Sequence, residues 1–200
     1  LNDIPLVQAD IQSLEYSEQQ SWQLRDGNQQ LLLEDHSESV IIASAFECKQ
    51  FSQTAYLPLR KIRGQITQLP CTPESLKMKM VICGECYITP AEEGFHGCGA
   101  TYNKDLFTTE LRDIDHQTNL AQIAATDAGL AAVLGNPTNE SLTGRANFRC
   151  TTSDYLPIAG PVPDRATMLE DYAKLRRDAK TPVTTPGAYL PNLYVNCGMG

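Results

Sequence analysis

The residues most suited to chemistry are two arginines in the segment 144–160, which reads GRANFRCTTSDYLPIAG. Arg145 and Arg149 lie among small and apolar residues, where a positive charge is costly unless an anion pairs with it. A guanidinium group binds a carboxylate or a phosphate through two parallel hydrogen bonds. The segment therefore indicates a site for a small anion. The alternative is a structural ion pair with an acidic residue of the chain itself.

Cysteine and histidine residues offer a second candidate site. Cys83 and Cys86, followed by His96 and Cys98, are residue types that bind structural zinc. The sequence around the first two cysteines predicts a continuous strand, on which positions three apart point to opposite faces. Only a turn at Gly84 would bring the two sulfur atoms together, so we expect no metal there. A zinc-supported binding module without enzymatic activity is the corresponding alternative function.

Other motifs of catalysis are missing from the sequence. The three histidines fit no metalloprotease pattern, and neither a nucleophile elbow, a P-loop nor a G-x-G-x-x-G fingerprint occurs. These absences argue against a hydrolase. The seven scattered cysteines, without a secretory signal, predict reduced thiols and a cytoplasmic protein. Since no apolar run reaches the roughly 18 residues of a membrane span, we expect no membrane partner.

The negative charge is concentrated near the start of the chain. The net charge is −8, and residues 1–47 hold nine acidic residues against one basic residue, Arg25. This excess argues against a nucleic-acid contact in the first quarter, and we expect no DNA partner. Basic clusters at 60–63 and 174–177 are more typical of a solvated surface than of an RNA contact.

Strands make up most of the predicted elements. Asp26-Gly27-Asn28 predicts a hairpin between strands at 22–25 and 30–34. The apolar run 40–45 predicts a strand buried on both faces, as in a parallel sheet. One helix is predicted from Thr118 or Asn119 to Leu134, and another over 165–178. Further strands are predicted at 57–60, 63–70, 78–82, 86–89, 96–101 and 193–197.

Six blocks of sequence occur in an order that resembles a known family. They are VIIASAFE (40–47), LPLRKIRGQITQLP (57–70), CYITP (86–90), GCGATY (97–102), GRANFRCTTSDYLPIAG (144–160) and LYVNCGMG (193–200). Together they resemble the D-amino-acid oxidase and glycine oxidase superfamily of flavoenzymes. RGQ at 63–65, the GR–x3–RC–x3–D pattern and VPD at 162–164 more closely resemble the C-terminal oxidoreductase half of bacterial bifunctional tRNA-modification enzymes.

The resemblance implies an FAD-dependent oxidoreductase that acts on a CH–NH bond. In this superfamily a hydride leaves the carbon between an amine and a carboxylate for the flavin, and water hydrolyses the imine. The tRNA-modifying enzymes thereby remove the carboxymethyl group from carboxymethylaminomethyl(thio)uridine at the wobble position. A separate half then methylates the exposed amine with S-adenosylmethionine. The alternative is an oxidase of small amines such as glycine, sarcosine or D-amino acids.

The resemblance also implies roles for single residues. Arg149 matches the arginine that pairs with the substrate carboxylate, and Tyr87 matches a tyrosine that hydrogen-bonds the same group; both are expected in the catalytic site. The alternative for Tyr87 is a half-buried strand aromatic. Arg145 is expected to serve the RNA substrate or to brace its loop. Arg63 and Gln65 are expected to be structural.

The same resemblance implies a cofactor site and a division of the chain. Ala45, Gly198, Met199 and Gly200 match positions near the flavin. The predicted fold is α+β: an antiparallel-sheet substrate domain at 53–143, flanked by parts of a Rossmann-like FAD-binding domain at 1–52 and 144–200. Because the pyrophosphate fingerprint is missing, we expect a fragment that binds FAD poorly and has little activity by itself. Flavin absorbance that co-purifies with the chain would contradict this expectation.

Overall fold

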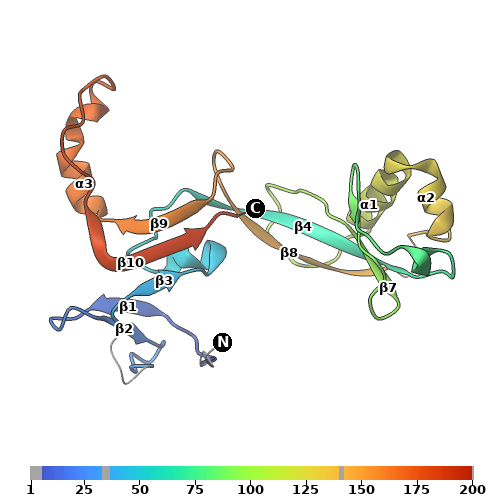
Figure 1. Ribbon diagram of the computed structural model, residues 1–200, viewed down its shortest axis with the longest axis horizontal. Coiled ribbons are helices and arrows are strands. Elements are labelled where there is room, and N and C mark those ends of the chain that lie inside the picture. The colour runs from blue at the N-terminus through green and yellow to red at the C-terminus, as the bar shows by residue number, and fades with distance from the viewer. Residues whose placement is uncertain (1–5, 33–36, 140–141, 200) are drawn as a thin grey trace. The chain divides into compact units, whose positions relative to one another are not determined.

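The computed structural model describes residues 6–32, 37–139 and 142–199, which form two compact units (Figure 1). One unit consists of Leu1–Arg60 and Cys150–Gly200, and the other of Lys61–Arg149. The predicted α+β fold with antiparallel sheets is confirmed. The assignment of cofactor and substrate domains stays a prediction. Within the described ranges, no helix has the length and apolar character needed to cross a membrane.

The first unit is built on a three-stranded sheet with the order β3-β10-β9. Strand β3 runs parallel to β10, and β9 runs antiparallel to it (Figure 1). A separate antiparallel pair is formed by β1 and β2. The bounds are β1 (Ser13–Tyr16), β2 (Trp22–Arg25), β3 (Val40–Ile42), β9 (Ile158–Pro163) and β10 (Tyr189–Cys197). The core side chains include Trp22, Ile42, Phe51, Leu59, Val162, Leu193 and Val195.

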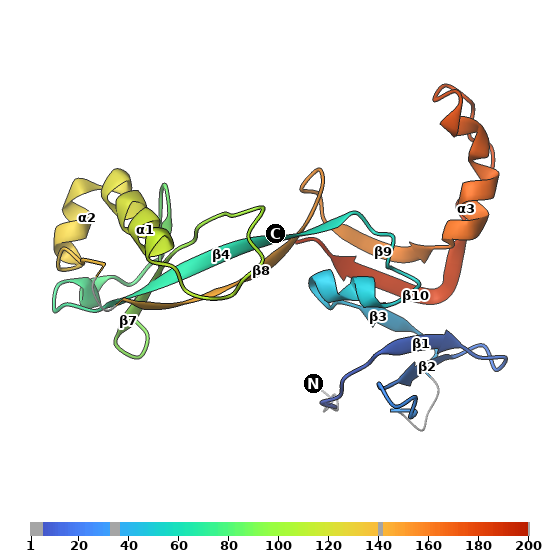
Figure 2. The same ribbon diagram turned by 180° about the vertical axis from the view of Figure 1, so that it is seen from behind.

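The second unit is built on a five-stranded sheet with the order β5-β6-β7-β4-β8. Helices α1 and α2 lie on the same side of β4 and β7 in both views (Figures 1 and 2). The bounds are β4 (Leu59–Pro70), β5 (Ile82–Cys83), β6 (Tyr87–Ile88), β7 (Phe95–Gly99), β8 (Thr143–Thr152), α1 (Asp113–Thr126) and α2 (Ala128–Val133). The core between sheet and helices includes Leu69, Ile88, Cys98, Ile123, Leu130 and Leu134.

Burial alternates along β4 and distinguishes the two faces of this sheet. Arg63, Gln65, Thr67 and Leu69 are all fully buried, as expected for the face that the helices cover. The residues between them, Gly64, Ile66 and Gln68, are partly or fully exposed. The same alternation holds in β7, where His96 and Cys98 are buried and Phe95 is exposed. The face opposite the helices is therefore the one that can carry a site.

Both predicted helices differ from the observed ones. The helix predicted to end at Leu134 is two helices, because Asp127 is extended and its side chain accepts hydrogen bonds from the first turn of α2. Helix α1 also begins earlier, at Asp113, where Gln65 of β4 bonds both backbone groups of Arg112. The prediction over 165–178 is α3 (Arg165–Asp171) followed by a 3₁₀ turn, η3 (Ala173–Arg176).

Several predicted strands are shorter or differently paired. The run 40–45 is a strand only over β3, and it is not buried on both faces, because Ile41 is 68% exposed while Ile42 on the opposite face is buried. A 3₁₀ turn, η1 (Ala45–Gln50), follows it. β2 pairs with β1, and only an isolated bridge joins Arg25 to Leu31, while 33–36 lie outside the described residues. The strands predicted at 57–60 and 63–70 form one continuous strand, β4. The 3₁₀ turn η2 (Ser75–Lys77) precedes β5.

The buried histidine of α1 gives a prediction for the pH dependence of stability. Burial lowers the pKa of His116, and this effect outweighs the charges of Asp113 and Asp115, which raise the pKa. Thr67 Oγ1 lies 2.8 Å from His116 Nδ1. As the pH falls, the histidine is therefore protonated in the unfolded chain at a higher pH than in the folded one. The free energy of unfolding should then fall as the pH drops below about 6.5. Urea unfolding between pH 7 and pH 5.5 measures this slope. An equal slope in His116→Gln would contradict the assignment.

Candidate functional site

Three residues predicted to bind substrate line one cavity on the open face of the second unit. Arg145 and Arg149 come from β8, and Tyr87 comes from β6. The cavity has a volume of about 310 Å³, and no acidic residue lines it. Arg145 and Arg149 are four positions apart on a strand, so they lie on one face. The two cations and the phenol are therefore arranged to receive a small anion.

Arg149 is held by backbone and aromatic groups. Its Nη1 donates a hydrogen bond of 3.1 Å to the carbonyl oxygen of Thr101, and its Cζ lies 6.0 Å from the centre of the Tyr102 ring. The guanidinium group also lies directly over Gly64, where an added Cβ would come within 2.5 Å of Nη1. The side chain is half-buried. The guanidinium position thus depends on the absence of a side chain at Gly64.

Within the described part of the chain, neither arginine of the cavity has an ion pair with an acidic residue. Among the described residues, the alternative of a structural ion pair therefore has no support for Arg145 and Arg149, and their role in binding an anion stays a prediction. Arg145 lies on strand β8 and not in a loop; it is exposed and makes no side-chain hydrogen bond with the described residues. Tyr87 is half-buried on β6, and its role as a ligand of the substrate stays a prediction.

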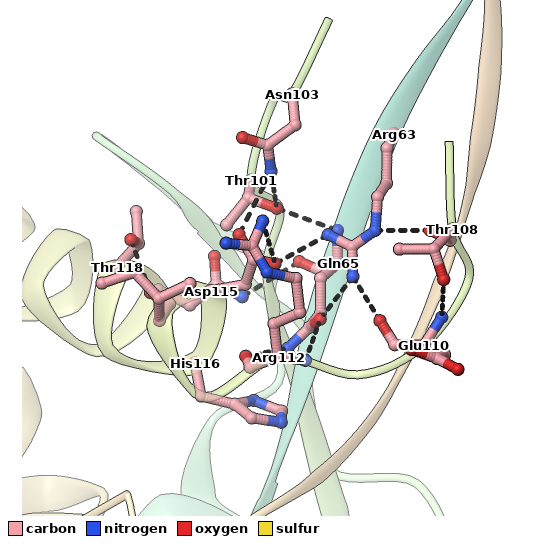
Figure 3. A network of polar contacts seen from close by, with 12 residues as sticks. Arg63, Gln65, Thr101, Asn103, Thr108, Glu110, Arg112, Asp115, His116 and Thr118 are labelled. Atoms are coloured by element: carbon pink, nitrogen blue, oxygen red, sulfur yellow. Dashed lines mark hydrogen bonds and ion pairs between the residues drawn. The ribbon is translucent and has the colours of Figure 1, made fainter. Parts of the chain in front are cut away.

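The structural ion pair of this unit lies elsewhere, between Arg63 and Asp115. Arg63 is fully buried, and its Nη1 lies 2.7 Å from Asp115 Oδ2 (Figure 3). Arg63 also donates to Gln65 Oε1 and to the carbonyl oxygens of Thr108 and Glu110. The structural role predicted for Arg63 and Gln65 agrees with this network.

The network continues to the cavity through Thr101. The backbone of Gln65 pairs with Thr101 through two hydrogen bonds, one to the Thr101 hydroxyl (3.0 Å) and one from the Thr101 amide (3.2 Å). Because the Thr101 carbonyl oxygen accepts a hydrogen bond from Arg149, Thr101 links the buried network to the guanidinium group of the cavity. Thr101 and Asp115 could not be predicted from local patterns, since their partners Gln65 and Arg63 are 36 and 52 residues away.

The cysteine cluster is not arranged as a metal site. A turn does occur at Gly84, contrary to the predicted continuous strand, but Cys83 is exposed and Cys86 is buried. Both ring nitrogens of His96 are hydrogen-bonded within the chain, to Thr89 O and Ser75 Oγ. Burial raises the pKa of the Cys98 thiol to about 12. Across the described residues, no group of three or more possible ligands is placed to hold a metal ion.

Comparison with known proteins identifies the family. The family model described as FAD dependent oxidoreductase matches residues 6–200. The chain belongs to this FAD-dependent oxidoreductase family. It is 41% identical, over 182 residues, to the tRNA 5-methylaminomethyl-2-thiouridine biosynthesis bifunctional protein MnmC of Chromobacterium violaceum, covering 91% of this chain and 27% of that protein. The identity to MnmC of Saccharophagus degradans is 41% over 160 residues, which cover 80% of this chain and 22% of that protein.

The chain thus spans about a quarter of the length of these relatives. Solved FAD-dependent oxidoreductases share its fold at low sequence identity. Glycine oxidase from Geobacillus kaustophilus has a TM-score of 0.61 at 16% identity, covering 95% of this chain and 42% of that one. L-proline dehydrogenase from P. horikoshii has a TM-score of 0.63 at 12% identity, covering 95% of this chain and 44% of that one. Both likenesses concern the fold.

The residues predicted to lie near the flavin are found at one sheet edge of the first unit. Ile42 of β3 is paired with Val195 of the parallel strand β10. Ala45 lies three residues after Ile42, and Gly198 lies three residues after Val195. Both have a positive φ, of 50° for Ala45 and 74° for Gly198. The carboxyl ends of parallel strands are where such folds bind nucleotide cofactors. The backbone conformation at Ala45 and Gly198 fits a site where main-chain atoms come close to a bound cofactor. Met199 is 62% exposed beside them, and Gly200 lies outside the described residues.

Proposed function

We propose that this chain provides the substrate-binding part of an FAD-dependent enzyme that oxidises the CH–NH bond of a carboxylated amine. The proposed substrate is carboxymethylaminomethyl(thio)uridine at the wobble position of tRNA, which loses its carboxymethyl group. The aminomethyl product would then be methylated by a separate S-adenosylmethionine-dependent domain. The observation that carries the proposal is the cavity of Arg145, Arg149 and Tyr87, which contains two cations and no acidic residue.

The residues of the cavity have separate roles in this proposal. The Arg149 guanidinium binds the substrate carboxylate through paired hydrogen bonds and fixes its orientation. The Tyr87 hydroxyl donates a hydrogen bond to the same carboxylate, and Arg145 adds positive charge at the more exposed side. FAD, held at the backbone of Ala45, Gly198 and Met199, supplies the hydride acceptor when it is bound.

The sequence relatives favour the tRNA substrate over a small amine. The names of the relatives at about 41% identity contain tRNA, whereas the glycine oxidase likeness is at 16% identity. We also place the protein in the cytoplasm, because all seven cysteines are free thiols and tRNA is modified inside the cell.

The experiment uses the complete gene product that contains these 200 residues. It is incubated with tRNA that carries carboxymethylaminomethyluridine, and the digested nucleosides are followed by mass spectrometry. Loss of the carboxymethyl group is the expected result. An unchanged tRNA together with peroxide released from glycine or sarcosine would overturn the tRNA assignment in favour of a small-molecule oxidase.

Gly64→Ala is expected to reduce this activity without unfolding the protein. The new Cβ would displace the guanidinium of Arg149, and a shift of about 1 Å at such a group costs up to about 100-fold in rate. We therefore expect kcat/KM for the modified tRNA to fall by about 10- to 100-fold, while the melting temperature changes little. The matched control is Gly27→Ala, whose Cβ meets only Gln12 Cγ at 3.7 Å. Equal activities of the two variants would contradict the placement of Arg149.

A further inference from the structure

A second cavity adjoins the anion cavity on the same open face. It has a volume of about 500 Å³, within the range of small-molecule sites. Ile66, Tyr87 and Arg145 line both cavities. A ligand with its carboxylate at Arg149 can therefore extend past these three residues into the larger space.

The larger cavity exists because strand β7 carries a glycine between two side-chain-bearing strands. Gly97 pairs with Gln68 of β4 on one side, and its carbonyl accepts from the Thr89 amide on the other. An added Cβ at Gly97 would lie 3.3 Å from Thr89 Oγ1 and 3.9 Å from Ile66 Cγ2. The side chains of β4 and of the residues after β6 thus form walls, and the backbone of β7 forms a floor.

The walls carry hydrogen-bonding groups with unused capacity. Gln68 Oε1 accepts a hydrogen bond from Thr143, and no described residue accepts one from the amide NH₂ of Gln68, which keeps its donors. Thr89 Oγ1 accepts from the Gly97 amide and keeps its own hydroxyl hydrogen as a donor. The carboxylates of Glu92 and Glu93 are acceptors at the same cavity, and the Phe95 ring, 41% exposed, provides an aromatic surface.

These groups match an unstacked pyrimidine base. A uracil ring presents carbonyl acceptors and one N–H donor, and proteins read single-stranded bases through such edge contacts together with aromatic side chains. We infer that the cavity of Gln68, Thr89, Phe95 and Gly97 is a nucleobase subsite, which binds the uridine while its carboxymethyl group lies at Arg149. This inference rests on the proposed function and explains how a tRNA substrate is distinguished from glycine, which would leave the larger cavity empty.

Two variants of the complete gene product test the subsite. Gly97→Val fills the cavity floor at a position whose φ is not positive, and Gln68→Leu removes the amide donors. Each is expected to raise the KM for carboxymethylaminomethyluridine-tRNA by about tenfold or more, which corresponds to a loss of about 1.4 kcal/mol in binding free energy. The kcat and the flavin content should stay unchanged. The matched control is Ala132→Val, an exposed position on α2 behind the sheet, which should leave KM unchanged.

A small competitor separates the subsite from the anion cavity. Iminodiacetate carries the carboxymethylamine group without a nucleoside, so its inhibition constant should stay within about twofold in Gly97→Val and Gln68→Leu. Equal weakening of iminodiacetate and tRNA would overturn a separate subsite. An unchanged KM for tRNA in both variants, while Arg149→Ala abolishes turnover, would overturn the subsite and leave the proposed function intact. A wild-type protein that leaves the carboxymethyl group in place would overturn both.

Discussion

Arg149→Ala should lower kcat/KM for carboxymethylaminomethyluridine-tRNA by about 100- to 1,000-fold in the complete gene product. Truncating one partner of a desolvated charge pair costs about 2–5 kcal/mol, and Arg149 is the cation of the cavity that is both half-buried and fixed by a backbone hydrogen bond. Arg149→Lys should retain part of the activity, because lysine keeps the charge but loses the planar fork. Steady-state kinetics with nucleoside analysis measures both variants.

The control for this prediction removes an exposed arginine outside the site. Arg177→Ala should leave kcat/KM within about twofold, as substitutions of exposed side chains away from a site have small effects. Flavin content and melting temperature should be the same in the variants Arg149→Ala, Arg149→Lys and Arg177→Ala as in the wild type. If Arg149→Ala retained more than about a tenth of the wild-type kcat/KM, the carboxylate would be bound elsewhere.

Arg63→Met is expected to reduce the free energy of unfolding by about 3–5 kcal/mol. The side chains of Arg63 and Asp115 are 0% and 6% exposed, and breaking a buried ion pair from one side is strongly destabilising. Asp115 would keep the longer contact with the more exposed Arg112, whose Nη1 lies 4.0 Å from Asp115 Oδ2. The substitution also leaves the carbonyl groups of Thr108 and Glu110 without their donor. Urea unfolding of wild type and variant measures the difference.

Two further proteins show whether the charge itself is responsible. The double variant Arg63→Met/Asp115→Leu should recover much of the loss, because no unpaired charge stays buried. Lys77→Ala breaks the exposed pair with Glu74, 2.6 Å in length, and should have little effect. A loss below about 1 kcal/mol in Arg63→Met would contradict the assignment of this pair as the central polar contact of the second unit.

The sequence indicated the anion site because its signal is local. Arg145 and Arg149 are four residues apart on one strand, and their apolar neighbours predict that an anion pairs with them, either a ligand or an acidic residue of the chain. Tyr87 could be assigned only through the family resemblance, since 58 residues separate it from Arg145 and nothing in its own neighbourhood indicates a ligand. The strands β2, β4 and β10 were predictable from local apolar patterns and turn residues.

The remaining features depend on long-range contacts. Helix α1 begins at Asp113 because Gln65 bonds the backbone of Arg112, a contact across 47 residues. Asp127 separates α1 from α2 through its cap, although the sequence around it is compatible with one helix. The strand at 40–45 was predicted to be buried on both faces because its residues are apolar, yet the burial of a sheet face depends on the segments that pack against that face.

Anaerobic reduction of the flavin in the complete gene product shows whether the carboxymethylated wobble uridine is the substrate. Two tRNA preparations are compared, which differ only in whether the wobble uridine carries the carboxymethyl group. We expect the tRNA with the carboxymethyl group to bleach the flavin absorbance and the tRNA without it to leave the absorbance unchanged, since only the former has a carboxylate for Arg149. Bleaching by glycine but by neither tRNA would contradict the proposed tRNA substrate.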